Sequence, residues 1–207
     1  MRVLVATSNA GKLRDFSAAG SRLGVQVVPL PNFGSLPTVE ENGITFEENA
    51  RHKAEAYSRA ASGKIVLADD SGLEVLALDG APGVRSARYA ADAGIAQSGK
   101  SQAEIDNANN QHLLKELEKR ERADRGARFV CMLAAARDGQ VLETFEGEVR
   151  GEILRAPRGQ AGFGYDPLFL VPALGKTLAE VPAEEKATIS HRGQAFRKFL
   201  EWLRANM

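Results

Sequence analysis

The sequence has a single cysteine, no excess of charge of either sign and few aromatic residues. Cys131 stands in the apolar segment FVCMLAAA and has no partner for an intramolecular disulfide, so we expect a buried, inert thiol in a reducing compartment. Lysine plus arginine and aspartate plus glutamate both number 27, and only 6% of the residues are aromatic. Because a protein that binds a nucleic-acid backbone carries a basic excess, this composition disfavours that class, while it leaves room for a local basic pocket for one small anion.

Long apolar runs are missing as well. No segment approaches the roughly 18 apolar residues of a transmembrane helix, and the N-terminal MRVLVATSNAGK has too short an apolar run for a signal peptide. We therefore expect a cytoplasmic protein without membrane contact. The 207 residues, 43% of them hydrophobic, are enough for a well-filled core, and we predict one domain over residues 1–207.

Strand and helix patterns alternate in the first third of the chain. Residues 2–6 form a β-branched apolar run typical of a buried strand, and the polar loop TSNAGK leads from it into a helical stretch over residues 12–23. A strand, a short polar loop and a helix start form an anion-binding arrangement, because free backbone N–H groups point out of the helix start. A capping box at Thr45 then opens a helix that runs to about residue 61.

The remainder of the chain adds a hairpin and two helices. A capping box at Ser101 opens a polar helix that ends near residue 120, and residues 127–136 and 140–153 are strands joined by Asp138-Gly139, the strongest hairpin signal present. A closing helix begins after Ser190 and places four apolar side chains on one face: Phe196, Phe199, Leu200 and Leu203. One hairpin among alternating helices and strands predicts an α/β fold with a mixed sheet.

Two adjacent carboxylates, Asp69 and Asp70, follow the apolar run that begins at Ile65. The run predicts a buried strand that ends at this pair, and LEVLAL after Gly72 is a candidate for its continuation. Two adjacent carboxylates in such a place repel each other unless a cation or hydrogen-bond donors compensate. Mg²⁺ is the usual compensating ion, held by one or two carboxylates and by substrate phosphates. Since successive side chains of a strand point to opposite faces, one aspartate is expected to face the ligand while the other braces the loop. The pair predicts a site that binds metal and activates water.

Four further polar clusters stand at loop or helix-start positions: TSNAGK, EENG, GFGYD and EEKATISHR. Each also has a purely structural interpretation, respectively an ordinary helix start, a solvated loop edge, a turn with an exposed aromatic residue, and surface charges beside a helix-start histidine. The Gly-Lys pair in TSNAGK lacks the spacing of a P-loop. Taken with Asp69 and Asp70, the clusters favour a metal-bound polyphosphate as the ligand.

Five stretches of the sequence, in order, match a known family: VATSNAGKLRDF, EENGITFEENARHKAEA, LADDSGLEVLALDGAPGVRSARYA, GFGYDPLF and GKTLAEVPAEEKATISHRGQAF. They cover nearly the whole domain, from the first strand to about residue 196. Each is weak alone, and five in sequence are highly specific. The chain resembles the inosine triphosphatase family of non-standard purine nucleoside triphosphate pyrophosphatases, and its bacterial branch in particular.

The resemblance implies an elongated, two-lobed α/β protein with a long twisted mixed sheet flanked by helices and an active-site cleft between the lobes. It implies hydrolysis of ITP, dITP and XTP to the monophosphate and pyrophosphate, with Mg²⁺ as the cofactor. This activity removes deaminated purines from the nucleotide pool before polymerases use them. The family resemblance also implies a homodimer.

The site residues carried over by the resemblance begin with a phosphate loop, in which Ser8 stands where the family often has glycine. A metal ligand falls within EENG, as Glu41 or alternatively Glu40, and Asp70 is both a metal ligand and the general base. Ser71 lies beside the phosphates. The phosphate loop is Thr7, Ser8, Asn9, Ala10, Gly11 and Lys12; the expected catalytic residues are Asp70, Lys12 and Asp69; the base-recognition loop is Phe163, Gly164, Tyr165 and Asp166; and Lys186, His191 and Arg192 complete the site.

These roles agree with the chemistry of the expected reaction. Attack at the α-phosphorus needs a deprotonated water and charge neutralisation, which a carboxylate near Mg²⁺, Lys12 and helix-start N–H groups supply. Arg192 or His191 could donate to the purine 6-oxygen, whereas adenine carries an amine there and would leave the donor unpaired. Phe163 could stack on the base. Guanine shares the 6-oxygen, so its exclusion has another origin.

Two other functions remain open at this point. One is a pyrophosphatase for a different aberrant nucleotide, such as a modified pyrimidine, which a substrate panel would distinguish. The other is a non-catalytic nucleotide sensor on the same fold, which the intact acidic residues at positions 41, 69 and 70 disfavour.

Overall fold

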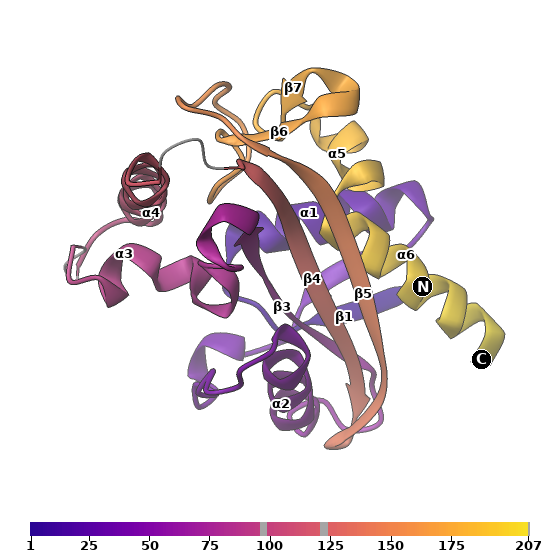
Figure 1. The fold of residues 1–207 in the computed structure, drawn as a ribbon. Helices are drawn as coiled ribbons and strands as arrows, with labels where there is room; N and C mark the ends of the chain where they lie inside the picture. Colours follow the sequence, from indigo (N-terminus) through magenta and orange to yellow (C-terminus); the bar gives the residue numbers. More distant parts are fainter. Residues whose placement is uncertain (96–98, 121–123, 207) are drawn as a thin grey trace. The chain divides into compact units, whose positions relative to one another are not determined.

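The computed structural model describes residues 1–95, 99–120 and 124–206 (Figure 1). The chain divides into two compact units. Unit 1 comprises Met1–Ser71, Val130–Glu148 and Ala183–Met207, and unit 2 comprises Gly72–Phe129 and Val149–Pro182. That the whole chain is one domain stays a prediction.

The described strands form one mixed sheet in the order β2-β1-β3-β4-β5-β6-β7. β1 runs parallel to both β2 and β3, whereas β6 runs antiparallel to both β5 and β7. The strands are β1 (Arg2–Val5), β2 (Gln26–Pro29), β3 (Val66–Val75), β4 (Gly126–Arg137), β5 (Gln140–Ile153), β6 (Phe169–Val171) and β7 (Lys176–Thr177). This sheet, together with the helices, confirms the predicted α/β class and its mixed strand directions.

Asp138 and Gly139 join β4 to β5, as the sequence predicts. Both residues have positive φ, 50° and 84°. A two-residue hairpin turn needs this left-handed backbone, which glycine adopts without strain and aspartate tolerates.

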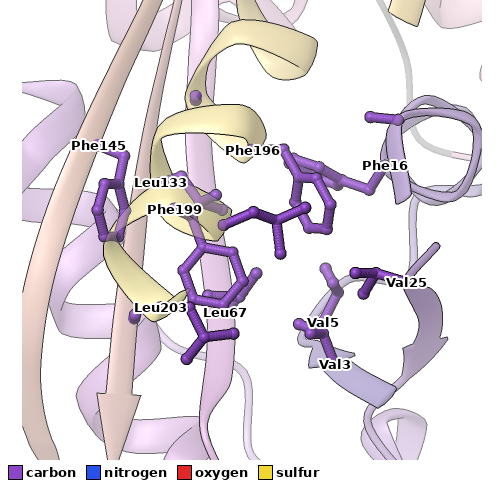
Figure 2. Packing of buried hydrophobic residues seen from close by; sticks show 14 of the residues in the cluster. Val3, Val5, Phe16, Val25, Leu67, Leu133, Phe145, Phe196, Phe199 and Leu203 are labelled. Carbon is purple, nitrogen blue, oxygen red and sulfur yellow. The ribbon is translucent and has the colours of Figure 1, made fainter. Parts of the chain in front are cut away.

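The helices of unit 1 are α1 (Ala10–Arg22), α2 (Phe46–Ser58), α5 (Ala183–Ile189) and α6 (His191–Asn206), with a short 3₁₀ turn η1 (Phe33–Ser35). The predicted capping box of α2 is present, since the Thr45 hydroxyl accepts from the Glu48 N–H and the Glu48 carboxylate accepts from the Thr45 N–H. All four apolar residues predicted on the closing helix are buried. In Figure 2, Phe196, Phe199 and Leu203 of α6 pack against Phe16 of α1 and Leu67 of β3.

Unit 1 buries apolar side chains in two clusters that use alternate residues of β3. Leu67 packs with α1 and α6, whereas Val66 and Ala68 pack with Ala50 and Ala54 of α2. Successive strand side chains point to opposite faces, so α1 with α6 covers one face of β3 and α2 covers the other. The same alternation directs Asp69 toward α1 and α6 and Asp70 toward α2.

The predicted strand end at Asp69 and Asp70 is wrong, whereas the continuation considered for the segment after Gly72 is present as far as Val75: β3 runs without a break through both aspartates. The strand β1 is the element that stops there. Its register with β3 reaches Val5 opposite Leu67, and the Ala6 N–H donates to the Leu67 carbonyl over 2.8 Å. On its other edge β3 is hydrogen-bonded to β4.

Unit 2 contains α3 (Tyr89–Asp92), α4 (Gln102–Glu118) and the 3₁₀ turns η2 (Leu76–Leu78), η3 (Gly83–Arg88) and η4 (Pro172–Leu174). The predicted capping box of Ser101 and Glu104 starts α4. Cys131, in unit 1, is fully buried as expected, and burial raises the pKa of its thiol. Among the described residues, none of the helices combines the length and apolar character that a membrane crossing requires.

Candidate active site

Asp69 and Asp70 lie in the part of β3 that extends past the end of β1. Ligands of sheets with parallel strands bind in the crevice outside the carboxyl ends of those strands. Asp69 shares its face of β3 with Leu67, and Asp70 shares the opposite face with Ala68. The two carboxylates therefore meet different helices.

Asp69 is surrounded by positive charge. Lys12 Nζ of α1 lies 3.0 Å from its Oδ2, Arg192 Nε of α6 lies 3.7 Å from the same oxygen, and Ser71 Oγ donates to it over 3.0 Å. Burial alone raises the pKa of this carboxyl, but the charges of Lys12, Arg192 and Lys53 outweigh burial and lower it to about 2. Asp69 is therefore an anion at any physiological pH, and a weak base.

Asp70 has a different environment on the α2 side. Asn49 Nδ2 donates to its Oδ2 over 2.9 Å, and Lys53 Nζ lies 3.4 Å from its Oδ1. Burial raises the pKa of Asp70 and the Glu41 charge adds to this rise, while Lys53 and Lys12 oppose it; the net direction is upward from 3.8. A carboxylate with a raised pKa is better suited to accept a proton near neutral pH.

Glu41 joins Asp70 through a shared lysine. Lys53 Nζ lies 2.8 Å from Glu41 Oε1 and 3.4 Å from Asp70 Oδ1, so a cation stands between the two carboxylates. Glu40, the alternative ligand, is exposed and accepts a hydrogen bond from the Asn42 amide over 2.8 Å. The geometry favours Glu41 over Glu40 as the partner of Asp70.

The pair of Glu41 and Asp70 is the part of unit 1 that fits a magnesium ion. Among the described residues, no group of three or more His, Cys, Asp and Glu side chains forms a ready metal cage. Mg²⁺ does not require one, since it is commonly held by one or two carboxylates and completed by substrate phosphates and water. Two carboxylates that already hold an ammonium group between them provide such a donor set.

The predicted phosphate loop leads into α1. Asn9 caps the helix by accepting from the Lys12 N–H over 3.0 Å, and the Asn9 N–H donates to Thr7 Oγ1 over 3.1 Å. Ser8 and Ala10 are exposed, and Gly11 is buried at the helix start. The first N–H groups of a helix have no acceptor within it, so this start can bind an anion beside Lys12.

Lys186 and Arg192 meet at Asp15 of α1. Lys186 Nζ lies 3.5 Å from Asp15 Oδ1, and Arg192 Nη1 donates to Asp15 Oδ2 over 3.2 Å. Arg192 Nη2 also donates to Ser71 Oγ over 2.7 Å, which connects the start of α6 to β3. Lys186 and Arg192 are buried, so their charges act in a site of low dielectric.

His191 stands at the first position of α6 and is buried. Burial and the charges of Arg192, Lys186 and Lys12 lower its pKa well below 6.5, so its imidazole is neutral at physiological pH. The helix start lies against the backbone of β5 at Gly147, where a Cβ would collide with the His191 carbonyl oxygen and the Ala195 nitrogen. Glycine at position 147 therefore permits this close contact.

The predicted base-recognition loop lies in unit 2. Tyr165 and Asp166 are buried: Tyr165 Oη donates to the Ser86 carbonyl over 2.8 Å, and Asp166 Oδ2 accepts from the Phe163 N–H over 2.9 Å. Phe163 and Gly164 are half-buried. Two of the four predicted residues thus have internal roles that hold the loop, and Phe163 is its partly exposed aromatic member.

Three polar residues of unit 1 were not assigned from the sequence: Asp15, Asn49 and Lys53. Asn49 and Lys53 are four residues apart in α2, which places them on the same helical face as the buried Ala50 and Ala54. An asparagine and a lysine within an alanine-rich face are the signal that could have identified them. Asp15 follows Lys12 by one helical turn in the same way.

Comparisons with known proteins agree over nearly the full length. A model of the Ham1 family matches residues 3–202. A dITP/XTP pyrophosphatase of Acidobacterium capsulatum is 51% identical over 200 residues, 97% of each chain, and one of Bacillus licheniformis is 50% identical over 95% of this chain and 94% of that protein. The structure is similar to a HAM1 protein from Coxiella burnetii (TM-score 0.81, 38% identity, 99% of each chain) and to the Staphylococcus aureus Ham1 protein (TM-score 0.80, 40% identity, 100% of each chain).

Proposed function

The chain belongs to the Ham1 family, and on that basis we propose that the polar cluster of unit 1 around Asp69 and Asp70 cleaves a purine nucleoside triphosphate with Mg²⁺ as cofactor. The protein is a hydrolase of phosphoric anhydrides. It hydrolyses non-standard purine nucleoside triphosphates, of which dITP and XTP are the substrates named for its relatives, to the monophosphate and pyrophosphate. The family match also confirms the resemblance drawn from the five sequence stretches.

One observation carries the assignment of the site: two adjacent buried carboxylates with pKa values displaced in opposite directions. If the two aspartates were only solvated residues of a strand, neither carboxylate would be buried and their pKa values would not be displaced in opposite directions. A paired arrangement of ionised and proton-accepting carboxylates is typical of acid–base sites. Asp70 is the member that takes the proton of the attacking water.

The cations of unit 1 bind and orient the triphosphate. Lys12, Lys186 and Arg192 come from α1, α5 and α6, and all three are paired with Asp15 or Asp69. These carboxylates hold the cationic side chains in place, which reduces the reorganisation needed when negative charge develops on the α-phosphate. Mg²⁺ held by Glu41 and Asp70 would neutralise charge on the phosphate oxygens.

Base recognition is assigned to Phe163, His191 and Arg192. A neutral His191 has one N–H donor, and Arg192 donates from its guanidinium, so either suits an oxygen at the purine 6-position. Phe163 offers a ring for stacking. Support comes from the family match, from the burial of His191 and Arg192, and from the half-buried position of Phe163.

Product analysis tests the proposal. Purified protein is incubated with dITP, XTP, dGTP, dATP and a modified pyrimidine nucleotide, with and without Mg²⁺, and the products are followed by phosphorus NMR. Pyrophosphate release from dITP and XTP, dependent on Mg²⁺, is the expected result. Orthophosphate and a nucleoside diphosphate would contradict the proposed cleavage, binding without turnover would indicate a sensor, and preferential cleavage of the pyrimidine would reassign the substrate.

A homodimer and a cytoplasmic location complete the proposal, and both rest on the family resemblance and on composition. Light scattering at micromolar concentration is expected to give twice the 22.3 kDa of one chain. A mass that stays at the monomer value at micromolar concentrations would contradict the proposed homodimer.

A further inference from the structure

Two side chains of α4 hold the peptide groups of Gly164 in the predicted base-recognition loop. The Gly164 N–H donates to Asp106 Oδ2 over 2.7 Å, and Asn110 Nδ2 donates to the Gly164 carbonyl over 3.0 Å. Asp106 and Asn110 are four residues apart, so they lie one above the other on the same face of the helix. Both polar groups of one residue are therefore fixed by one helix.

The Asp106 side chain is itself fixed by a hydrogen bond within α4. Gln102, one turn before Asp106, donates from Nε2 to Asp106 Oδ1 over 2.8 Å, so each carboxylate oxygen of Asp106 has a donor. Gly164 has φ +60°, a left-handed backbone that other residues adopt with strain. The helix thus stabilises a conformation for which glycine is required.

A second connection runs from α4 to the same loop. Asn109 accepts from the Ala90 N–H over 2.9 Å and donates to the Ala87 carbonyl over 3.2 Å, which fixes the segment that follows Ser86. The Ser86 carbonyl in turn accepts from Tyr165 Oη. Neighbouring residues of one helix therefore secure the loop both at Gly164 and at Tyr165.

We propose that Asp106 and Asn110 are positioning residues for purine recognition, which hold the Gly164 peptide and so fix the direction of the adjacent Phe163 ring. This inference rests on the proposed function, in which Phe163 contacts the base. A loop held in its binding conformation loses less conformational entropy when the ligand binds, so affinity and discrimination both depend on the two side chains. The chemical step depends on unit 1 residues and does not need them.

The test uses Asp106→Leu, Asn110→Leu and the conservative Asp106→Asn, which keeps an oxygen acceptor for the Gly164 N–H. Asn107→Leu is the matched control, because Asn107 is exposed on the same helix and its side chain makes no hydrogen bond within the described part of the chain. We measure kcat and KM for dITP, the preference for dITP over dGTP, and hydrogen exchange at the Gly164 amide.

Both leucine variants are expected to raise the KM for dITP by about tenfold and to reduce the preference over dGTP, with kcat within about threefold of the wild type. Exchange at Gly164 should become faster in Asp106→Leu, and Asp106→Asn should restore most of the wild-type values. A loss of kcat at constant KM would instead show that the variants only reduce the amount of folded enzyme, and unchanged KM with unchanged preference would overturn the proposal.

A variant that does not fold and a wild-type protein without activity both leave the proposal testable. If Asp106→Leu does not fold, Asn110→Leu carries the same test from the other side of the peptide. If the wild-type protein releases no pyrophosphate from dITP, the proposed function is wrong, whatever the role of α4. Hydrogen exchange at the Gly164 amide in the variants then still tests whether α4 holds the loop, and unchanged exchange would show that it does not.

Discussion

Asp69 and Asp70 are adjacent in β3, yet each carboxylate is held by a different lysine: Lys12 Nζ lies 3.0 Å from Asp69, and Lys53 Nζ lies 3.4 Å from Asp70. The alternation of strand side chains sends Asp69 toward α1 and α6 and Asp70 toward α2. Their pKa values move in opposite directions, to about 2 for Asp69 and upward for Asp70. The pair thus contains one carboxylate that remains charged and one that can take a proton.

Asp70→Asn removes the proton acceptor while it keeps one oxygen and the shape of the side chain. The expected kcat for dITP falls by about 10²–10⁴, the range for loss of a general base. Binding of dITP with Mg²⁺ should survive to a measurable extent. Steady-state kinetics together with calorimetric titration of the variant check this, and wild-type turnover in Asp70→Asn would overturn the assignment of the base.

Lys53→Gln should move the acid limb of the pH profile of kcat/KM to higher pH. The base works when ionised, so activity is lost as pH falls through the pKa of Asp70, which lies above 3.8. Lys53 is the strongest of the groups that lower this pKa, so its removal raises the pKa further. Arg51→Gln is the matched control, because Arg51 lies on the same helix, half a turn away, and its ion-pair partner within the described residues is Glu47, whose side chain is about half exposed. An unmoved limb in Lys53→Gln would disconnect the lysine from the base.

Asp69 should contribute to folding stability, and this contribution should be lost at low pH. Its folded-state pKa of about 2 is below the ordinary 3.8, so the folded protein favours the ionised form; the contribution is fully present above pH 3.8 and is lost as pH falls through about 2. This lowering of the pKa corresponds to about 2 kcal/mol of the free energy of unfolding. Urea unfolding of wild type and Asp69→Asn at pH 6 and pH 2.5 should show a difference that shrinks at the lower pH, whereas the exposed Asp79→Asn should show none at either.

Asp69→Asn should also alter the reaction less than Asp70→Asn does. It leaves Lys12 and Arg192 without the anion that holds them, so metal affinity or loop geometry should suffer more than proton transfer. Raising the Mg²⁺ concentration is expected to restore part of the activity. Measurement of kcat against Mg²⁺ for both variants separates them, and an Asp69→Asn enzyme with the larger loss of kcat at saturating Mg²⁺ would exchange the two roles.

Arg192→Ala tests recognition of the purine 6-oxygen. Loss of a buried polar contact is worth about 1–3 kcal/mol, so the preference for dITP over dATP should shrink by roughly tenfold or more. Arg197→Ala, on an exposed position of the same helix, should leave that preference unchanged. Because Arg192 also donates to Ser71 and Asp15, an equal loss for both nucleotides is the informative alternative, and it would assign the side chain to the triphosphate or to the fold.

The sequence predicts the class of fold and the residues on β3 because local rules apply there. The hairpin turn at Asp138-Gly139, the capping boxes at Thr45 and Ser101 and the apolar face of α6 all depend on neighbours within a few residues, and the structure confirms them. The length of β3 followed only in part from such rules, because the sequence marks the segment after Gly72 as a candidate strand without joining it to the run before Asp69. Asp, Asp, Ser and Gly are poor strand formers, and the strand continues through them because Leu73 and Val75 are buried beyond.

The contacts of Lys53 could not be predicted from sequence, since a lysine on an alanine-rich helix usually reaches solvent. It is buried because Glu41 and Asp70, from segments 12 and 17 residues away in the chain, meet at its ammonium group. The same limit applies to Asp106 and Asn110, whose partner Gly164 lies 58 and 54 residues further along the chain. Such long-range pairs depend on how elements pack, which a local pattern does not contain.

The missing side chain at Gly147 has a mechanical consequence. Because backbone meets backbone there, residue 147 has no side chain that could absorb small displacements between β5 and the first turn of α6. If β5 bends at Gly147, the start of α6 must therefore move with it, and His191 and Arg192 move with the helix start. An alanine at position 147 would push the start of α6 away from β5 by the size of about one methyl group. It would thereby change the orientation of the His191 and Arg192 side chains without replacing either of them.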